Sequence, residues 1–151
     1  MGRIPSDHAF TAESLYGIRR EPAYLGALSF LRRRYTRDLT GVDVAVTGVP
    51  LDIATTNRPG ARFGPRAVRE ASSQIAWGPP YGCPFDPLER LAVIDYGDCA
   101  WDLGRPGEMP AAVEEHIAGI LAAGASPLTI GGDHFILWPI LRAMRAHHGP
   151  L

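Results

Sequence analysis

The chain has 151 residues, 46% of them hydrophobic, which is enough for one soluble domain with a buried core. Its 15 Lys and Arg and 16 Asp and Glu leave a formal net charge of −1, which argues against nucleic acid and against an anionic membrane as partners. No apolar run approaches a membrane span, residues 1–8 lack the apolar core of a signal peptide, and Cys83 and Cys99 show no metal-type spacing, so we expect a cytoplasmic protein with free thiols.

Two segments precede the first expected strand. Residues 1–21 are polar and lack periodicity, which predicts an extended or poorly ordered arm that could pack on a neighbour. In residues 22–35 the apolar side chains fall at helical spacing, which predicts a helix. The basic run Arg32-Arg33-Arg34 indicates a solvated face, with the carboxylates of a partner subunit as the alternative contact.

The remaining chain alternates between strand and helix patterns, which predicts an α/β fold with a parallel sheet. The expected strands are 43–50, 91–96 and 127–130. Helices are expected from Gly64-Pro65 onward, over 111–123, and after His134. The expected apolar faces of these helices are, in chain order, Val68, Ala71, Ser72 and Ile75; Val113, Ile117, Ile120 and Leu121; and Leu137, Ile140, Leu141 and Met144.

Two long loops interrupt this alternation. Residues 51–63 carry Asp52, Arg58 and Arg62, and such a loop could form a lip over a pocket, with Asp52 facing a cationic substrate or anchoring the loop. The simpler interpretation is that Asp52 and the arginines pair and hold the shape of the loop. Residues 77–90 are rich in proline and must be irregular; their aromatic side chains Trp77, Tyr81 and Phe85 could line a pocket or an oligomer interface.

The stretch Gly131-Gly132-Asp133-His134 follows the third expected strand directly. Open α/β sheets bind ligands beyond the carboxyl ends of their strands, and a neutral imidazole is a common metal ligand, so His134 is a candidate ligand. Two alternatives stay open at this point: His134 is satisfied by a neighbouring carboxylate, or Asp133 caps the following helix. The pair His147-His148 indicates a solvated helix end.

Three separated blocks resemble the N-terminal half of the ureohydrolase family, in its agmatinase-like branch. They are Gly48-Val49-Pro50-Leu51-Asp52, then Arg62-Phe63-Gly64-Pro65 leading into Val68-Arg69, and finally Gly131-Gly132-Asp133-His134. The resemblance runs from about Phe30 to Leu151. It implies a three-layer α/β/α arginase-type parallel sheet, apparently truncated, with residues 1–21 as an arm, residues 22–151 as the N-terminal part of a single ureohydrolase domain, and homo-oligomers of trimers or hexamers.

The resemblance also implies a reaction, the hydrolysis of a guanidino group to urea and an amine at a centre of two Mn²⁺ ions. Two such ions lower the pKa of a bridging water, and the hydroxide attacks the guanidinium carbon. His134 inherits the place of a manganese ligand, and Asp133 a supporting place beside it. The implied substrate is a small cationic guanidino compound, with agmatine, cleaved to putrescine and urea, ahead of a guanidino acid such as 4-guanidinobutanoate.

The chain departs from the family pattern in one large respect. The other family ligands come from two later blocks, of the types Asp-Ala-His-x-Asp and Asp-x-Asp, and this sequence contains neither. Asp95 and Asp98 match neither block, so we assign them no ligand role and identify no catalytic residue. We therefore expect part of a protein roughly twice as long, which alone would neither hold two metals nor turn over substrate. The alternatives are an inactive assembly partner of a full-length ureohydrolase and an unrelated α/β domain.

Overall fold

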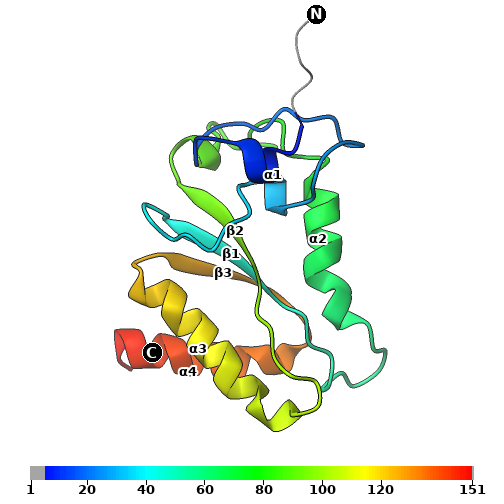
Figure 1. The fold of residues 1–151 in the computed structure, drawn as a ribbon, viewed down its shortest axis with the longest axis vertical. Coiled ribbons are helices and arrows are strands. Elements are labelled where there is room, and N and C mark those ends of the chain that lie inside the picture. The colour runs from blue at the N-terminus through cyan, green and yellow to red at the C-terminus, as the bar shows by residue number, and fades with distance from the viewer. Residues whose placement is uncertain (1–5, 151) are drawn as a thin grey trace, which may run out of the picture.

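The computed structural model describes residues 6–150 and contains one sheet of three parallel strands (Figure 1). These are β1 (Val44–Val49), β2 (Val93–Asp98) and β3 (Ser126–Gly131), in the spatial order β2-β1-β3. The predicted parallel sheet is thus confirmed, although β2 lies two residues later than the sequence pattern suggests. Because β1 is central and all three strands are parallel, their carboxyl ends meet at one edge of the sheet.

Helices cover both faces of this sheet. Figure 1 shows α3 (Met109–Ala122) and α4 (Leu137–His148) side by side under one face, while α2 (Gly64–Ser72) lies across the other. A fourth, short helix, α1 (His8–Thr11), belongs to the N-terminal segment. This arrangement confirms the predicted α/β/α layers.

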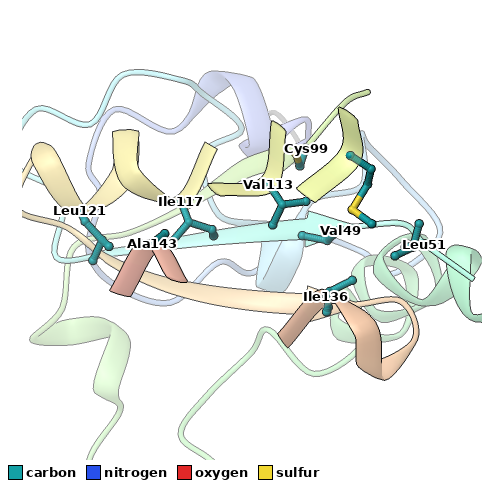
Figure 2. Close-up of a cluster of buried hydrophobic side chains, with 9 residues drawn as sticks. Val49, Leu51, Cys99, Val113, Ile117, Leu121, Ile136 and Ala143 are labelled. Carbon is teal, nitrogen blue, oxygen red and sulfur yellow. The ribbon is translucent and has the colours of Figure 1, made fainter. Parts of the chain in front are cut away.

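The main hydrophobic core lies between the sheet and the pair α3–α4 (Figure 2). The predicted apolar stripe of α3 is confirmed, since Val113, Ile117 and Leu121 are buried there and Ile120 is buried in a second cluster. Burying a side chain of this size contributes about 1.5–3 kcal/mol to stability. The core cluster consists of Val49, Leu51, Cys99, Met109, Val113, Ile117, Leu121, Ile136 and Ala143.

The other two helices bury only part of the expected faces: Ser72 is buried as predicted, and Ile140 and Met144 are partly buried against the core. In α2 the buried residues are Pro65, Arg69 and Ser72, whereas Val68 and Ile75 of the predicted face are exposed. An ion pair of Arg69 with the sheet, described below, decides the orientation of this helix. In α4 the residues Pro139 and Ala143 are buried, and two leucines of the predicted apolar face remain exposed.

The helix predicted over residues 22–35 is wrong. The segment forms turns and one short 3-10 turn, Phe30–Arg32, because Gly26, Leu31 and Arg32 adopt positive φ angles that no α-helix allows. Arg32 and Arg33 are also fully buried, so the solvated face expected for them is wrong, and only Arg34 of the run is exposed.

Backbone carbonyls receive the two buried guanidinium groups. Arg32 donates to the Ala27 carbonyl at 3.2 Å and lies 3.7 Å from the Glu21 carboxylate. Arg33 donates to the Gly17 carbonyl at 2.8 Å. Burial lowers the pKa of Arg33 to about 10, with the nearby charge of Arg19 as a further cause. These contacts are within the chain, and among the described residues they leave Arg32 Nε and Arg33 Nη1 buried without a hydrogen-bond partner.

The N-terminal segment packs against the rest of the chain, so a poorly ordered arm is wrong for residues 6–21; residues 1–5 lie outside the described part. Ala9 is fully buried, and its carbonyl accepts a 2.7 Å hydrogen bond from Tyr35 N–H. The buried Glu21 carboxylate accepts the N–H groups of Asp7 at 2.7 Å and His8 at 3.2 Å. In residues 6–150 we find no helix with the length and apolar character needed to cross a membrane.

Candidate functional site at the carboxyl edge of the sheet

The backbones of β3 and of the loop after β1 approach each other closely at the carboxyl edge. Gly132 has a φ of +65°, and a Cβ there would lie 2.4 Å from the Val49 carbonyl oxygen. A Cβ on Gly64 would lie 2.5 Å from the Gly131 oxygen. Only glycine fits such spaces, so the glycines of the Gly131–His134 turn bring it against the 51–63 loop.

Asp133 ties the two segments together. Its N–H donates to the Leu51 carbonyl at 2.8 Å, and its carboxylate accepts the N–H of Ala54 at 2.7 Å and of Phe135 at 2.9 Å. The side chain is 7% exposed. The bond from Phe135 is the capping interaction proposed as an alternative role for Asp133. The residue therefore fixes the position of its neighbour His134.

His134 is exposed at the carboxyl end of β3 and borders an open hollow of about 630 Å³. The side chain is thus accessible rather than buried against a carboxylate. Across residues 6–150 no group of three or more His, Cys, Asp or Glu residues is placed to hold a metal ion. Among the described residues, this edge therefore offers a metal ion one imidazole ligand, His134, and no complete ligand set.

The 51–63 loop carries the pair that the simpler interpretation predicts. The Asp52 carboxylate accepts the Gly60 N–H at 2.7 Å and pairs with the Arg62 guanidinium. The hydrogen bond from Arg62 lowers the pKa of Asp52 below its ordinary value. Asp52 is therefore an anchor of the loop, already neutralised by Arg62. Arg58 is exposed in the middle of the loop, and its role toward a substrate stays a prediction.

A second hollow, of about 440 Å³, lies over the carboxyl ends of β1 and β2. Its walls are largely apolar, including Ile53, Phe63 and Leu103, and its two carboxylates, Asp52 and Asp98, are both paired with arginines. The hollow beside His134 therefore suits metal chemistry better.

Asp95 and Asp98 serve the fold. Arg69 of α2 donates to Asp95 at 2.7 and 2.9 Å and to Asp98 at 2.7 Å. Asp95 also accepts hydrogen bonds from the N–H groups of Phe30 at 2.8 Å and Gly97 at 2.9 Å. Both of its carboxylate oxygens are therefore already used within the fold. Burial alone would lower the pKa of Arg69, but the two carboxylates outweigh it and raise that pKa. This agrees with assigning the two aspartates no ligand role.

His116 of α3 makes a half-buried polar contact that sequence reasoning missed. Its Nε2 lies 2.7 Å from the Thr47 hydroxyl, which itself donates to the Gly97 carbonyl at 2.8 Å. Because that hydroxyl proton is used, Nε2 of His116 must be the donor. Burial, and after it the charge of Arg37, lower the pKa of His116 to about 4. The one sequence signal for this contact was that His116 is next to Ile117, a residue of the predicted apolar stripe.

The other residues noted in the sequence lie away from this edge. His147 and His148 are exposed at the end of α4, as predicted for a solvated helix end. Residues 77–90 are irregular apart from the 3-10 turn Pro87–Glu89, and Trp77 and Tyr81 are exposed there. Whether these aromatic side chains serve a pocket or an interface stays open.

The sequence of this chain is similar to those of known enzymes. Agmatinase from Chromobacterium violaceum is 51% identical over 146 residues, which is 97% of this chain and 45% of that protein. The human mitochondrial guanidino acid hydrolase is 42% identical over 84% of this chain and 36% of its own length. The chain thus spans less than half the length of these two relatives.

Solved structures give the same result. A hypothetical agmatinase from Burkholderia thailandensis superposes with a TM-score of 0.92 and 52% identity, covering 97% of this chain and 47% of that one. Trypanosoma cruzi formiminoglutamase, solved with Mn²⁺, superposes with a TM-score of 0.67 and 25% identity, covering 81% of this chain and 41% of that one. The model of the arginase family matches residues 42–151, and the chain belongs to that family.

Proposed function

We propose that this chain forms part of a metal-dependent hydrolase that cleaves agmatine to putrescine and urea. One observation carries the proposal: 51% identity to an agmatinase over 97% of the chain. That stretch includes the turn which holds His134 at the carboxyl edge of the sheet. The predicted cytoplasmic location and the trimeric or hexameric assembly stay predictions.

We assign His134 as one ligand of a manganese centre. The imidazole is accessible, borders the 630 Å³ hollow, and stands on a turn held by the three hydrogen bonds of Asp133. A Trypanosoma cruzi relative was solved with Mn²⁺, a cation that accepts imidazole together with oxygen ligands. Bound Mn²⁺ would supply a hydroxide near neutral pH by acidifying a bound water. The remaining ligands must come from outside residues 6–150, so we expect the chain alone to be inactive.

A guanidino acid is the second candidate substrate. The human guanidino acid hydrolase is 42% identical, and the exposed Arg58 would attract a carboxylate but repel the amine of agmatine. The lower identity places this candidate behind agmatine.

Urea release in the presence of Mn²⁺ tests the proposal. The 151-residue chain is assayed alone and after co-expression with the complementary segment, defined as the part of C. violaceum agmatinase outside the stretch that this chain matches. We expect urea only from the pair, and more from agmatine than from 4-guanidinobutanoate. Substitution His134→Ala should lower both manganese content and urea release at least 100-fold, while His147→Ala at the exposed end of α4 should change neither.

Three results would contradict this proposal. Urea release by the chain alone would contradict its dependence on outside ligands. An unchanged manganese content in His134→Ala would remove the ligand role. A folded pair that binds Mn²⁺ but releases no urea would favour the inactive assembly partner.

A further inference from the structure

Two arginines of the N-terminal half, Arg19 and Arg33, are buried without a carboxylate partner. Arg19 is 8% exposed and Arg33 is fully buried. Arginine is almost never fully buried unless it is paired. The chain follows that rule elsewhere, since the buried Arg69 pairs with two aspartates of β2 and the buried Arg32 with a glutamate. Within residues 6–150, by contrast, neither Arg19 nor Arg33 forms an ion pair.

Carbonyl groups of one bend in the N-terminal segment hold both guanidinium groups. Arg19 donates to the Ser14 carbonyl, and Arg33 donates to the Gly17 carbonyl at 2.8 Å. Arg33 Nε also donates to the Leu31 carbonyl at 3.2 Å. These bonds leave Arg19 Nε and Arg33 Nη1 buried with no hydrogen-bond partner in the part of the chain that the structure describes. Since buried N–H groups are nearly always hydrogen-bonded, both call for a further acceptor.

The charges around this arginine pair do not balance. Burial and the charge of Arg19 lower the pKa of Arg33, and the charge of the buried Asp86 opposes them. Asp86 makes no ion pair with either arginine, and its carboxylate accepts the Leu88 N–H at 2.9 Å. Both guanidinium groups are protonated at neutral pH. Two buried cations therefore stand against one carboxylate, and a buried charge without compensation strongly destabilises a fold.

A hollow of about 520 Å³ adjoins the arginine pair, and its walls include Leu31, Asp86 and Leu88. The Leu31 carbonyl accepts the hydrogen bond from Arg33, and the Leu88 carbonyl accepts one from Gly17 N–H at 2.8 Å. Figure 1 shows the N-terminal segment beside the loop that precedes β2, as these bonds require. The hollow therefore brings small ions from the solvent next to the two arginines.

We propose that one small monovalent anion, of the size of chloride, binds between Arg19 and Arg33 and accepts hydrogen bonds from Arg19 Nε and Arg33 Nη1. A single negative charge cancels the surplus, whereas a divalent anion would reverse it beside Asp86. A water molecule would satisfy the N–H groups but leave the charge. The anion joins the N-terminal segment to the loop before β2. Its site lies near the start of β2, while His134 lies at the carboxyl end of β3, so it is independent of the proposed function.

Urea denaturation of the chain in chloride and in gluconate tests the site, because gluconate is too large to enter it. Equal ionic strength in the two salts keeps general screening the same. An anion that binds only the folded chain lowers the equilibrium constant of unfolding, and we expect a value at least about tenfold lower in chloride at roughly 0.5 M salt. Arg19→Met and Arg33→Met should each abolish this difference. The matched control is Arg20→Met at the exposed neighbouring position, which should preserve it.

Anomalous scattering from bromide in crystals of the wild-type chain locates the ion directly and does not depend on the folding of any variant. We expect a bromide peak within hydrogen-bonding distance of Arg19 Nε and Arg33 Nη1. Equal unfolding constants in chloride and gluconate, or the absence of that peak, would overturn the site and leave water as the acceptor. A chloride effect of wild-type size in folded Arg33→Met would also overturn it, because the anion would then bind elsewhere.

Discussion

The Asp133 carboxylate accepts a 2.7 Å hydrogen bond from the backbone N–H of Ala54, which lies 79 residues earlier in the chain. Asp133→Ala leaves two N–H groups without their acceptor, so we expect a loss of about 1.5–3 kcal/mol in the free energy of unfolding and faster exchange of the Ala54 amide. Asp133→Asn, with one amide oxygen, should lose about half as much. Urea denaturation measures both, and Asp102→Ala, at an exposed ion pair, is the control. A change below about 0.5 kcal/mol in Asp133→Ala would show that the link is weak.

The close backbone approach at Gly132 predicts opposite effects for two Gly→Ala changes. Gly132→Ala combines a φ of +65° with a contact of 2.4 Å to the Val49 oxygen, so we expect a loss of more than about 3 kcal/mol. Gly119→Ala in the exposed part of α3 meets nothing within 4 Å and should stabilise the chain by about 0.5–1 kcal/mol. Thermal unfolding of both variants provides the comparison, and equal melting temperatures would contradict it.

The ion pair of Arg69 should be essential to the folded state. Arg69→Met leaves the fully buried Asp95 carboxylate without its cation, at a cost of about 3–5 kcal/mol. Arg66→Met, at an exposed position of the same helix, should cost less than about 0.5 kcal/mol. If the two variants unfold at the same urea concentration, α2 is held by its other contacts.

His116 gives the stability a defined pH dependence. Its folded-state pKa of about 4 lies below the ordinary 6.5, so the unfolded chain takes up the proton first as the pH falls. The contribution is complete above pH 6.5, declines between pH 6.5 and 4, and levels off at a loss of at most about 3 kcal/mol. Urea titrations of wild type and His116→Gln over this range should differ in slope, because glutamine does not titrate. Parallel curves would assign the pH dependence to other groups.

The two cysteines should differ in reactivity. Cys99 is 3% exposed and its thiol donates to the Ala112 carbonyl, and burial raises its pKa to about 11. Cys83 is partly exposed in the 77–90 loop. Iodoacetamide at pH 8 should therefore alkylate Cys83 alone in the folded chain and both thiols in urea, as mass spectrometry of the peptides will show. Equal labelling in the folded chain would refute the burial of Cys99.

The sequence predicted the sheet well because β-branched apolar runs between loops have few alternatives, and β1 and β3 lie within one residue of their expected bounds. It failed over residues 22–35, where apolar spacing matched a helix but Gly26 and Leu31 adopt positive φ. The burial of Arg32 and Arg33 was hidden for another reason. Their partners are mainly backbone carbonyls. Because every residue has a backbone carbonyl, the sequence does not show which ones accept these hydrogen bonds.

The position of His134 was predictable, because a strand followed by two glycines defines where the chain turns at the sheet edge, and its role as a metal ligand stays a prediction. The bond between Asp133 and Ala54 was not predictable, since it depends on how two distant loops meet. Asp52 shows the same difference. Its pairing with Arg62 is local and was predicted from the sequence, whereas its hydrogen bond from Gly60 N–H depends on the shape of the loop and was not.

The 51–63 loop is fastened near both ends and open between them. Ala54 is bonded to Asp133, Gly60 to Asp52, and the Ala61 carbonyl to Gly132 N–H at 3.4 Å. Residues 55–59 lie between these attachments, so they can be exchanged without removing any of the three hydrogen bonds. Changes in the length or charge of this segment would reshape the rim of the sheet edge and leave the attachment of His134 untouched, so loop grafting here is the direct test of the role predicted for Arg58 toward a substrate.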